Sequence, residues 1–250
     1  MDFFDANITI GNRSVIFHEQ IFNMTLLIRK MKQCNIKKAL ICSTIAQYNN
    51  SIQGNLMLIE EIKQMPAFLP VWILLPFSEK EKGTPCKLKK ELIDKKIKGV
   101  IMQPKSHQYD INDRYSALLL EILEYLQMPL FLSFNKEIAL NELNELLKCH
   151  PKLPIIIRDL SYSSDRKIFG LLDKYENLKI ETGNYMVFYG IEEIVMRFGS
   201  SRLIFGSNAP EMSLGSAVTH ILMSDITPAE KRKIAYENMD ELTGRIRVDE

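Results

Sequence analysis

Short apolar segments recur along the chain at intervals of roughly 23 to 36 residues, with longer amphipathic stretches between them. The eight segments begin near Phe3, Ala39, Phe68, Gly99, Leu130, Ile155, Leu178 and Leu203. Runs such as 155–157 (III) lack the alternation of a strand exposed on one face, and are typical of parallel strands buried on both faces. Between them, residues 19–34, 112–127 and 137–149 place apolar side chains on one stripe and predict helices.

Eight strand–helix units predict an α/β fold, a (β/α)8 TIM barrel, in a single domain spanning residues 1–250. A doubly wound open sheet is the alternative, but it would normally have fewer strands and a glycine-rich first turn. The first turn, Ile10-Gly11-Asn12, has no G-x-G-x-x-G pattern. Near the end of the chain, Thr227-Pro228-Ala229-Glu230 is a capping box that predicts the start of the last helix, which closes at Gly244.

Composition limits the partners of the protein. The chain carries 32 Lys and Arg against 31 Asp and Glu, which argues against nucleic-acid binding. The longest apolar run, 67–77, is too short to span a membrane and contains Pro70 and Pro76. The four cysteines have no C-x-x-C spacing and the start has no basic signal region, so we expect a cytoplasmic protein with reduced thiols.

Several strand ends together resemble one family. They are residues 4–11 (FDANITIG), 99–104 (GVIMQP), 129–133 (PLFLS), 153–160 (LPIIIRDL) and 202–210 (RLIFGSNAP). The first is similar to a D-x-H-x-H-x-G strand with both histidines replaced. The family is the amidohydrolase-related (amidohydrolase 2) group of metal-dependent TIM-barrel hydrolases and decarboxylases, and the resemblance covers essentially the whole chain.

The resemblance implies a site for a divalent metal, commonly zinc, at the ends of the first, fifth, sixth and eighth strands. The matching positions here are Asn7, Thr9, Ser133, Asp159 and Asn208. Zinc requires neutral imidazole, thiolate or carboxylate ligands, and four of these five residues offer none of them. We therefore predict no metal and no other cofactor. The alternatives are a weakly held, hydrated divalent ion at Asp159, or a site rebuilt from Asp159, Glu181 and a loop histidine.

Two functional hypotheses follow. In the first, the metal centre is lost and the barrel binds a small molecule. In the second, the protein is a metal-independent hydrolase or lactonase, with Asp159 and either His107 or His18 as acid and base. Its substrate would be a small carboxylated molecule oriented by Lys105 or Arg158, although these cations could instead pair with Asp159 or Glu181 and fill the vacated metal pocket.

The predicted ligand-binding set is drawn from the strand ends and comprises Lys105, Arg158, Gln103, Ser133, Glu181, Asn208, Asn7 and Thr9. Met186, Phe188 and Tyr189 are expected to lie in the core or line the pocket. The sequence leaves open whether any catalysis is retained. It also leaves open the oligomeric state, with a homodimer among the alternatives.

Overall fold

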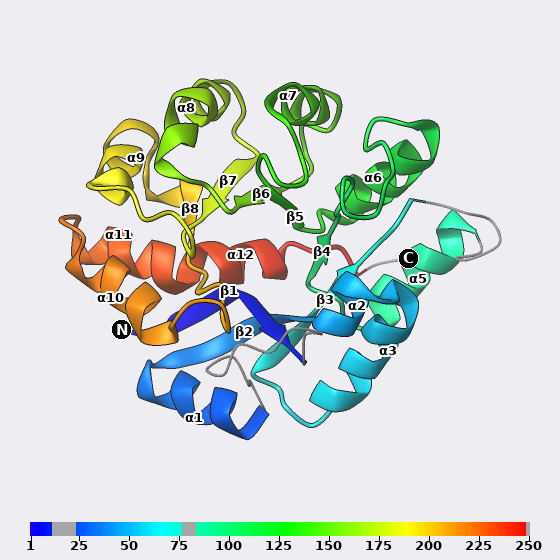
Figure 1. Ribbon diagram of the computed structural model, residues 1–250, viewed down its shortest axis with the longest axis horizontal. Helices are drawn as coiled ribbons and strands as arrows, with labels where there is room; N and C mark the ends of the chain where they lie inside the picture. Colours follow the sequence, from blue (N-terminus) through cyan, green and yellow to red (C-terminus); the bar gives the residue numbers. More distant parts are fainter. Residues whose placement is uncertain (12–23, 77–83, 249–250) are drawn as a thin grey trace.

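The computed structural model describes residues 1–11, 24–76 and 84–248, and contains one eight-stranded parallel sheet (Figure 1). Its strands are paired in the order of the chain, from β1 to β8. They are β1 (Phe3–Ile10), β2 (Ile36–Ser43), β3 (Phe68–Ile73), β4 (Gly99–Ile101), β5 (Leu130–Ser133), β6 (Ile155–Arg158), β7 (Leu178–Glu181) and β8 (Leu203–Ile204). The arrangement is a nearly closed (β/α)8 barrel, which confirms the predicted fold class.

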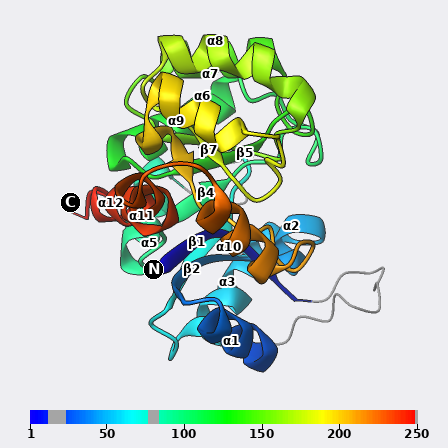
Figure 2. The ribbon, with the colours of Figure 1, turned by 90° about the vertical axis from the view of Figure 1, so that its left-hand side faces the viewer.

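Helices surround the sheet, with α6 to α9 on one side of it and α1 and α3 on the other (Figure 2). The helices are α1 (Met24–Gln33), α2 (Thr44–Tyr48), α3 (Ser51–Ile62), α5 (Pro85–Asp94), α6 (Arg114–Leu126), α7 (Leu140–Cys149), α8 (Asp165–Lys174), α9 (Gly190–Phe198), α10 (Leu214–Met223), α11 (Pro228–Arg232) and α12 (Asn238–Gly244). The predicted helices match α1, α6 and α7, except that the part of the first one before residue 24 lies outside the described residues. No helix in the described part of the chain is long and apolar enough to cross a membrane.

The barrel closes where β8 meets β1, and this seam has fewer regular pairs than the other strand junctions. The Ala6 N–H donates to the Phe205 carbonyl (3.0 Å) and the Thr9 N–H to the Ala209 carbonyl (2.8 Å). Between them, the Ser207 N–H donates to the carboxylate of Asp5 (2.9 Å). A buried side chain therefore supplies one of the bonds that would otherwise join the two backbones.

Two apolar cores fill the molecule, one inside the barrel and one between the sheet and the helices. Met239 and Leu242 of α12 belong to the inner core, where they pack with residues such as Phe4. Phe4 lies near the start of β1, so α12 covers the end of the barrel at which the strands begin, as Figure 2 shows. The polar strand ends lie at the opposite end.

The start of β1 is irregular, and the irregularity positions a site residue. Its register against β2 shifts between Asp5 and Ile8. As a result, the consecutive residues Ala6 and Asn7 both line the cavity inside the barrel. Such a shift redirects a side chain in the way a β-bulge does.

Candidate functional site

Three strand-end side chains meet at the C-terminal end of the barrel. Arg158, at the end of β6, donates from Nη1 to Oδ1 of Asn7 on β1 (3.2 Å). Asn7 in turn donates from Nδ2 to Oε2 of Glu181 at the end of β7 (2.9 Å). All three side chains are buried, and Arg158 is only 7% exposed. The structure thus brings together three of the predicted ligand-binding residues, but as partners of one another.

Glu181 occupies a space that two glycines leave open. A Cβ on Gly206 would overlap Oε1 of Glu181, and a Cβ on Gly183 would lie 2.6 Å from the same atom. The Gly183 N–H donates to this oxygen (2.5 Å). Burial raises the pKa of Glu181 to about 8, although the Gly183 N–H, the charge of Arg158 and the amide of Asn7 favour the ionised form.

Asp5 is a second buried carboxyl group, and sequence reasoning did not select it. Its Oδ1 accepts from the N–H groups of Asn7 (3.0 Å) and Ser207 (2.9 Å), and its Oδ2 has no hydrogen-bond partner. Burial raises the pKa of Asp5 to about 6, against the lowering effect of its bonds to Ser207 and Asn7. The available signal was an acidic residue inside a predicted strand, two positions before Asn7.

Asp159, Asn184 and Asn208 form the more exposed part of the site. Asn184 donates from Nδ2 to Oδ1 of Asp159 (2.5 Å), and Asn208 donates from Nδ2 to Oδ1 of Asn184 (3.2 Å). Burial opposes ionisation of Asp159, but the charge of Arg158 and hydrogen bonds from Ser133 and Asn184 together lower its pKa. Asp159 and Asn208 both have left-handed backbone angles, with φ of 59° and 55°. Asn184 was also missed, since nothing in the local sequence distinguishes it from an ordinary loop residue.

The structure does not join the proposed acid–base pair in the described part of the chain. His107 bonds through Nε2 to the backbone carbonyl of Gln47 (3.2 Å), while its buried Nδ1 has no partner. The hydrogen bonds found for Asp159 go instead to Asn184 and Ser133. His18, the other candidate, lies outside the described residues.

The remaining predicted ligand residues lie around the same end of the barrel. Lys105 is exposed and donates from Nζ to the carbonyl of Asn135 (3.3 Å). Gln103 is buried, and its Oε1 has no hydrogen-bond partner among the described residues. Thr9 contacts Cys42 through Oγ1 and Sγ (3.2 Å). These residues are therefore near the strand ends, but in the described part of the chain no hydrogen bond or ion pair joins them to Arg158, Asn7 or Glu181.

The cavity beneath Arg158 is very small. It measures about 10 Å³ and is lined by Arg158, Asn7 and apolar side chains of the inner core. That volume is about enough for one water molecule. The space between Arg158 and the inner core is thus too small for a ligand larger than water.

The residues present do not fit the divalent metal that the fold family implies. Asn7, Thr9, Ser133 and Asn208 offer neutral oxygen or amide groups, and Arg158 places a fixed positive charge 3.2 Å from Asn7. Within residues 1–11, 24–76 and 84–248, no three His, Cys, Asp or Glu side chains come close enough to hold a metal ion.

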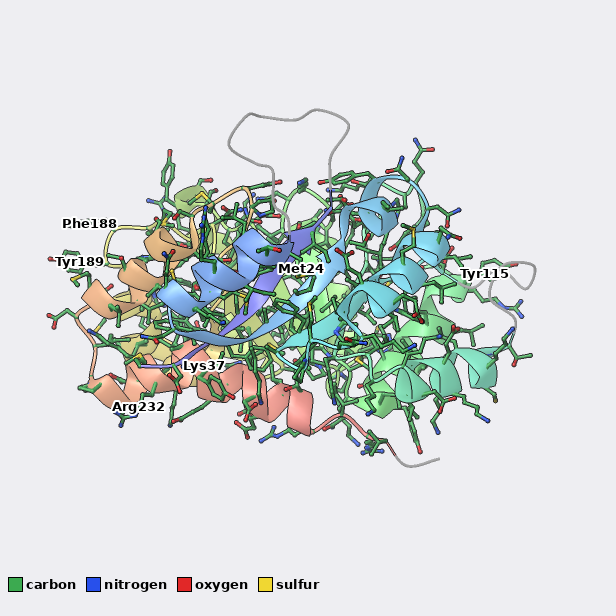
Figure 3. All side chains as sticks on the ribbon, turned by 90° about the horizontal axis from the view of Figure 1, so that it is seen from below. Met24, Lys37, Tyr115, Phe188, Tyr189 and Arg232 are labelled. Atoms are coloured by element: carbon green, nitrogen blue, oxygen red, sulfur yellow. The ribbon has the colours of Figure 1, made fainter. Side chains whose placement is uncertain are left out.

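One alternative for the segment after β7 was wrong. Met186, Phe188 and Tyr189 are 47%, 88% and 60% exposed, so they do not lie in the core. Figure 3 shows Phe188 and Tyr189 at the periphery of the molecule. Tyr189 begins α9 with a left-handed φ of 53°, and the loop before it carries these side chains outward.

The family model described as amidohydrolase matches residues 42–242. Among solved structures, a 2,6-dihydroxybenzoate decarboxylase in complex with 2,6-dihydroxybenzoate has a TM-score of 0.80 at 14% identity, over 97% of this chain and 99% of that one. An uncharacterised TIM-barrel protein from Bordetella bronchiseptica has a TM-score of 0.72 at 18% identity, over 89% and 83%. A 5-carboxyvanillate decarboxylase from Sphingomonas paucimobilis has a TM-score of 0.72 at 11% identity, over 98% and 99%. No curated protein matches the chain in sequence. At these identities the structural likeness establishes the fold alone.

Proposed function

Because the chain belongs to the amidohydrolase family, we propose that it is a divergent member that has lost the metal centre and binds a small molecule. The observation that carries this proposal is the position of Arg158. Its guanidinium is buried and hydrogen-bonded to Asn7, the residue that stands where the resemblance implies a metal-binding histidine. A fixed cation at that place repels a divalent ion. It also supplies the positive charge that a metal would otherwise provide for the nearby carboxylates.

Backbone strain supports a retained binding role. Five non-glycine residues with left-handed φ lie in loops that follow the strands, at the end of the barrel that carries active sites in this fold. They are Gln108, Asn135, Asp159, Tyr189 and Asn208. Such conformations cost on the order of 1 kcal/mol each and cluster at functional sites.

The proposal also includes a cytoplasmic location and no nucleic-acid partner, in keeping with the nearly equal numbers of basic and acidic residues.

A metal-independent hydrolase or lactonase is the second candidate. Its candidate base is Asp159, a half-buried carboxylate at the barrel end whose pKa is lowered by the charge of Arg158 and by hydrogen bonds from Ser133 and Asn184. The same lowering makes Asp159 a weak general base. Under this hypothesis Asp159→Asn abolishes turnover of small lactones and esters, while Asn144→Asp, a distant half-buried change, leaves it intact. Under the first hypothesis the wild type shows no turnover to lose.

Metal content tests the main proposal. Tag-free protein prepared without chelator is analysed by mass spectrometry as purified, and again after incubation with zinc or manganese and dialysis. Cys34, Cys86 and Cys149 are at least partly accessible and can bind zinc adventitiously, so a parallel sample is alkylated. We expect the alkylated sample to hold only traces. Near-stoichiometric metal that survives alkylation would overturn the proposal.

Ligand binding is tested by thermal shift against a library of small metabolites. Stabilisation by a single chemical class supports the proposal when Asp159→Asn loses it and Asn144→Asp retains it. A library that stabilises neither the wild type nor the control would argue that the barrel serves another role.

A further inference from the structure

The side chains at the barrel end form a directed sequence of hydrogen bonds. Arg158 donates to Asn7, Asn7 donates to Asn208 (3.5 Å), Asn208 donates to Asn184, and Asn184 donates to Asp159. Asp159 follows Arg158 directly in the chain, so the backbone between them closes the row of hydrogen bonds into a ring. We call these five residues the amide ring.

The charges at its two ends fix the direction of the ring. A guanidinium can only donate, so Asn7 must turn its oxygen to Arg158. An ionised carboxylate can only accept, so Asn184 must turn its nitrogen to Asp159. Asn208, between them, then accepts on one side and donates on the other. No other orientation of the three amides satisfies every member.

Asn7 and Asn208 use both hydrogens of their amide nitrogens, whereas the buried Nε of Arg158 has no partner among the described residues. The second hydrogen on Nδ2 of Asn7 goes to Glu181, and that on Nδ2 of Asn208 goes to Oε2 of Glu211 (3.4 Å). Asn7 thus spends both hydrogens and its acceptor inside the site. A metal ion bound to Oδ1 of Asn7 would have to lie beside the guanidinium of Arg158, which donates to the same oxygen.

The ring spans the part of the barrel with the sparsest backbone pairing. Its members come from the end of β6, from within β1 and from the loops after β6, β7 and β8. β8 contributes only two residues to the sheet, and the seam between β8 and β1 has few backbone bonds. Strand ends here therefore need a side-chain cross-link.

Building on the proposed loss of the metal, we infer that the amide ring replaces the metal centre as the cross-link of β6, β7, β8 and β1. Each asparagine must then both donate and accept. An asparagine that merely replaced an aspartate in a dormant metal site would have no need to donate. If the ring is the cross-link, aspartate at position 208 destabilises the fold. If Asn208 merely replaced an aspartate of a dormant metal site, aspartate there leaves the fold stable and restores metal binding.

Asn208→Asp is the test, because it removes the donating group with no change in shape. The introduced carboxylate could no longer donate to Asn184, and its charge would face Glu211 while Glu181 and Asp159 lie close by. We expect the folding equilibrium constant at pH 8, from urea unfolding, to fall by about 10- to 100-fold. Asn144→Asp is the matched control. Asn144 is also half-buried, but the bond that it makes uses its oxygen, which accepts from the hydroxyl of Tyr175 and is kept in aspartate. It should change little.

The deficit of Asn208→Asp relative to wild type should shrink as the pH falls, because a protonated carboxyl group can again donate. Zinc or manganese should not restore the variant. Stability equal to wild type at pH 8, or stabilisation by either metal, would overturn the ring. If the wild type itself binds stoichiometric metal, the proposed function is wrong. If the wild type is metal-free and Asn208→Asp is as stable as the wild type, only the inference of the amide ring is wrong.

A double-mutant cycle covers the case in which Asn208→Asp does not fold. Asn184→Ala and Asp159→Ala break the same bond, so the double variant should lose less than the product of the two single fold-changes. Asn177→Ala is the control partner for Asn184→Ala. Asn177 bonds to the carbonyls of His150 and Leu153 at the other end of the barrel. The fold-changes of Asn177→Ala and Asn184→Ala should therefore multiply in the double variant. Multiplicative behaviour of the first pair would contradict the ring.

Discussion

Glu181 is a carboxyl group whose surroundings oppose its charge, and this has a consequence for stability. Burial raises its pKa from 4.5 to about 8. The folded state therefore binds a proton more tightly than the unfolded state, so the stabilisation is complete below about pH 4.5 and is lost as the pH rises through 8. We predict that the free energy of unfolding falls by a few kcal/mol across this window.

Glu181→Gln isolates this effect, because glutamine does not titrate. Urea unfolding of wild type and variant at intervals from pH 6.5 to 8.5 should show a falling curve for wild type and a flatter one for the variant. The range starts above pH 6 because Asp5, with its pKa raised to about 6, contributes its own slope at lower pH. Parallel curves would mean that Glu181 ionises normally in the fold.

Arg158→Met tests whether the guanidinium is structural. Methionine fills part of the same space but leaves Oδ1 of Asn7 without its donor and Glu181 without the opposing charge. We predict a loss of about 3 kcal/mol in the free energy of unfolding, as expected when one member of a buried charged cluster is removed. Lys105→Met, an exposed change on the same face, is the control and should fall within about 0.5 kcal/mol of wild type. Equal stability of the two variants would show that Arg158 is dispensable.

Sequence reasoning identified which polar residues gather at the barrel end but not how they pair. Asn7, Arg158, Glu181 and Asn208 were predicted because each follows a buried strand. Asn184 was not, because its approach to Asp159 depends on the path of the loop after β7. Side-chain pairing between loops has no periodic signal in a sequence.

At the scale of elements, strand positions were predictable to within a few residues. Most of the eight strands begin where the apolar runs begin. β2 starts earlier, at Ile36, because Lys38 extends to Asp240 (2.6 Å) at the end of the barrel that α12 covers and so can lie inside the strand. The capping box at Thr227 and Glu230 was confirmed. The π-helical turn Lys233–Glu237 was not foreseen, because it lies where the Phe205 N–H bonds to the carbonyl of Ile234, a tertiary contact.

The approach of β7 to the segment after β8 depends on one glycine. A Cβ on Gly206 would overlap the carboxyl group of Glu181, which is buried and has nowhere to move. We predict that Gly206→Ala lowers the free energy of unfolding by about 2–3 kcal/mol through overpacking. The measurement is urea unfolding at pH 7.

Gly170→Ala is the matched control for this substitution. Gly170 lies within α8, and a Cβ there would meet nothing within 4 Å. Alanine favours the helix over glycine, so this variant should gain about 0.5–1 kcal/mol. A loss in both variants would point to a general intolerance of the fold. A gain or no change in Gly206→Ala would show that Glu181 can leave its position at little cost.

At the scale of the whole molecule, the barrel depends on α12, which covers the end at which the strands begin. α12 inserts Met239 and Leu242 into the inner core, beside the first strand of the chain. Lys38 of β2 reaches Asp240, and Lys98 reaches the carbonyl of Thr243 (3.5 Å). The last helix thus completes an inner core that begins with Phe4, so contacts between the two ends of the sequence close the fold.

This arrangement predicts that a chain ending at residue 232 loses its cooperative fold. Removal of α12 would expose the inner core to water at the end where the strands begin, and each lost side chain of this kind costs about 2–5 kcal/mol. Such a loss is comparable with the whole stability of a typical domain. We expect far-ultraviolet circular dichroism to show retained helix, with dye binding to exposed apolar surface and no sharp urea transition. A chain ending at residue 247 keeps α12 and Ile246, and the first residue that it lacks, Val248, is 59% exposed, so it should unfold like the full chain. A sharp transition in the shorter chain would show that eight strands close the barrel without the helix that covers it.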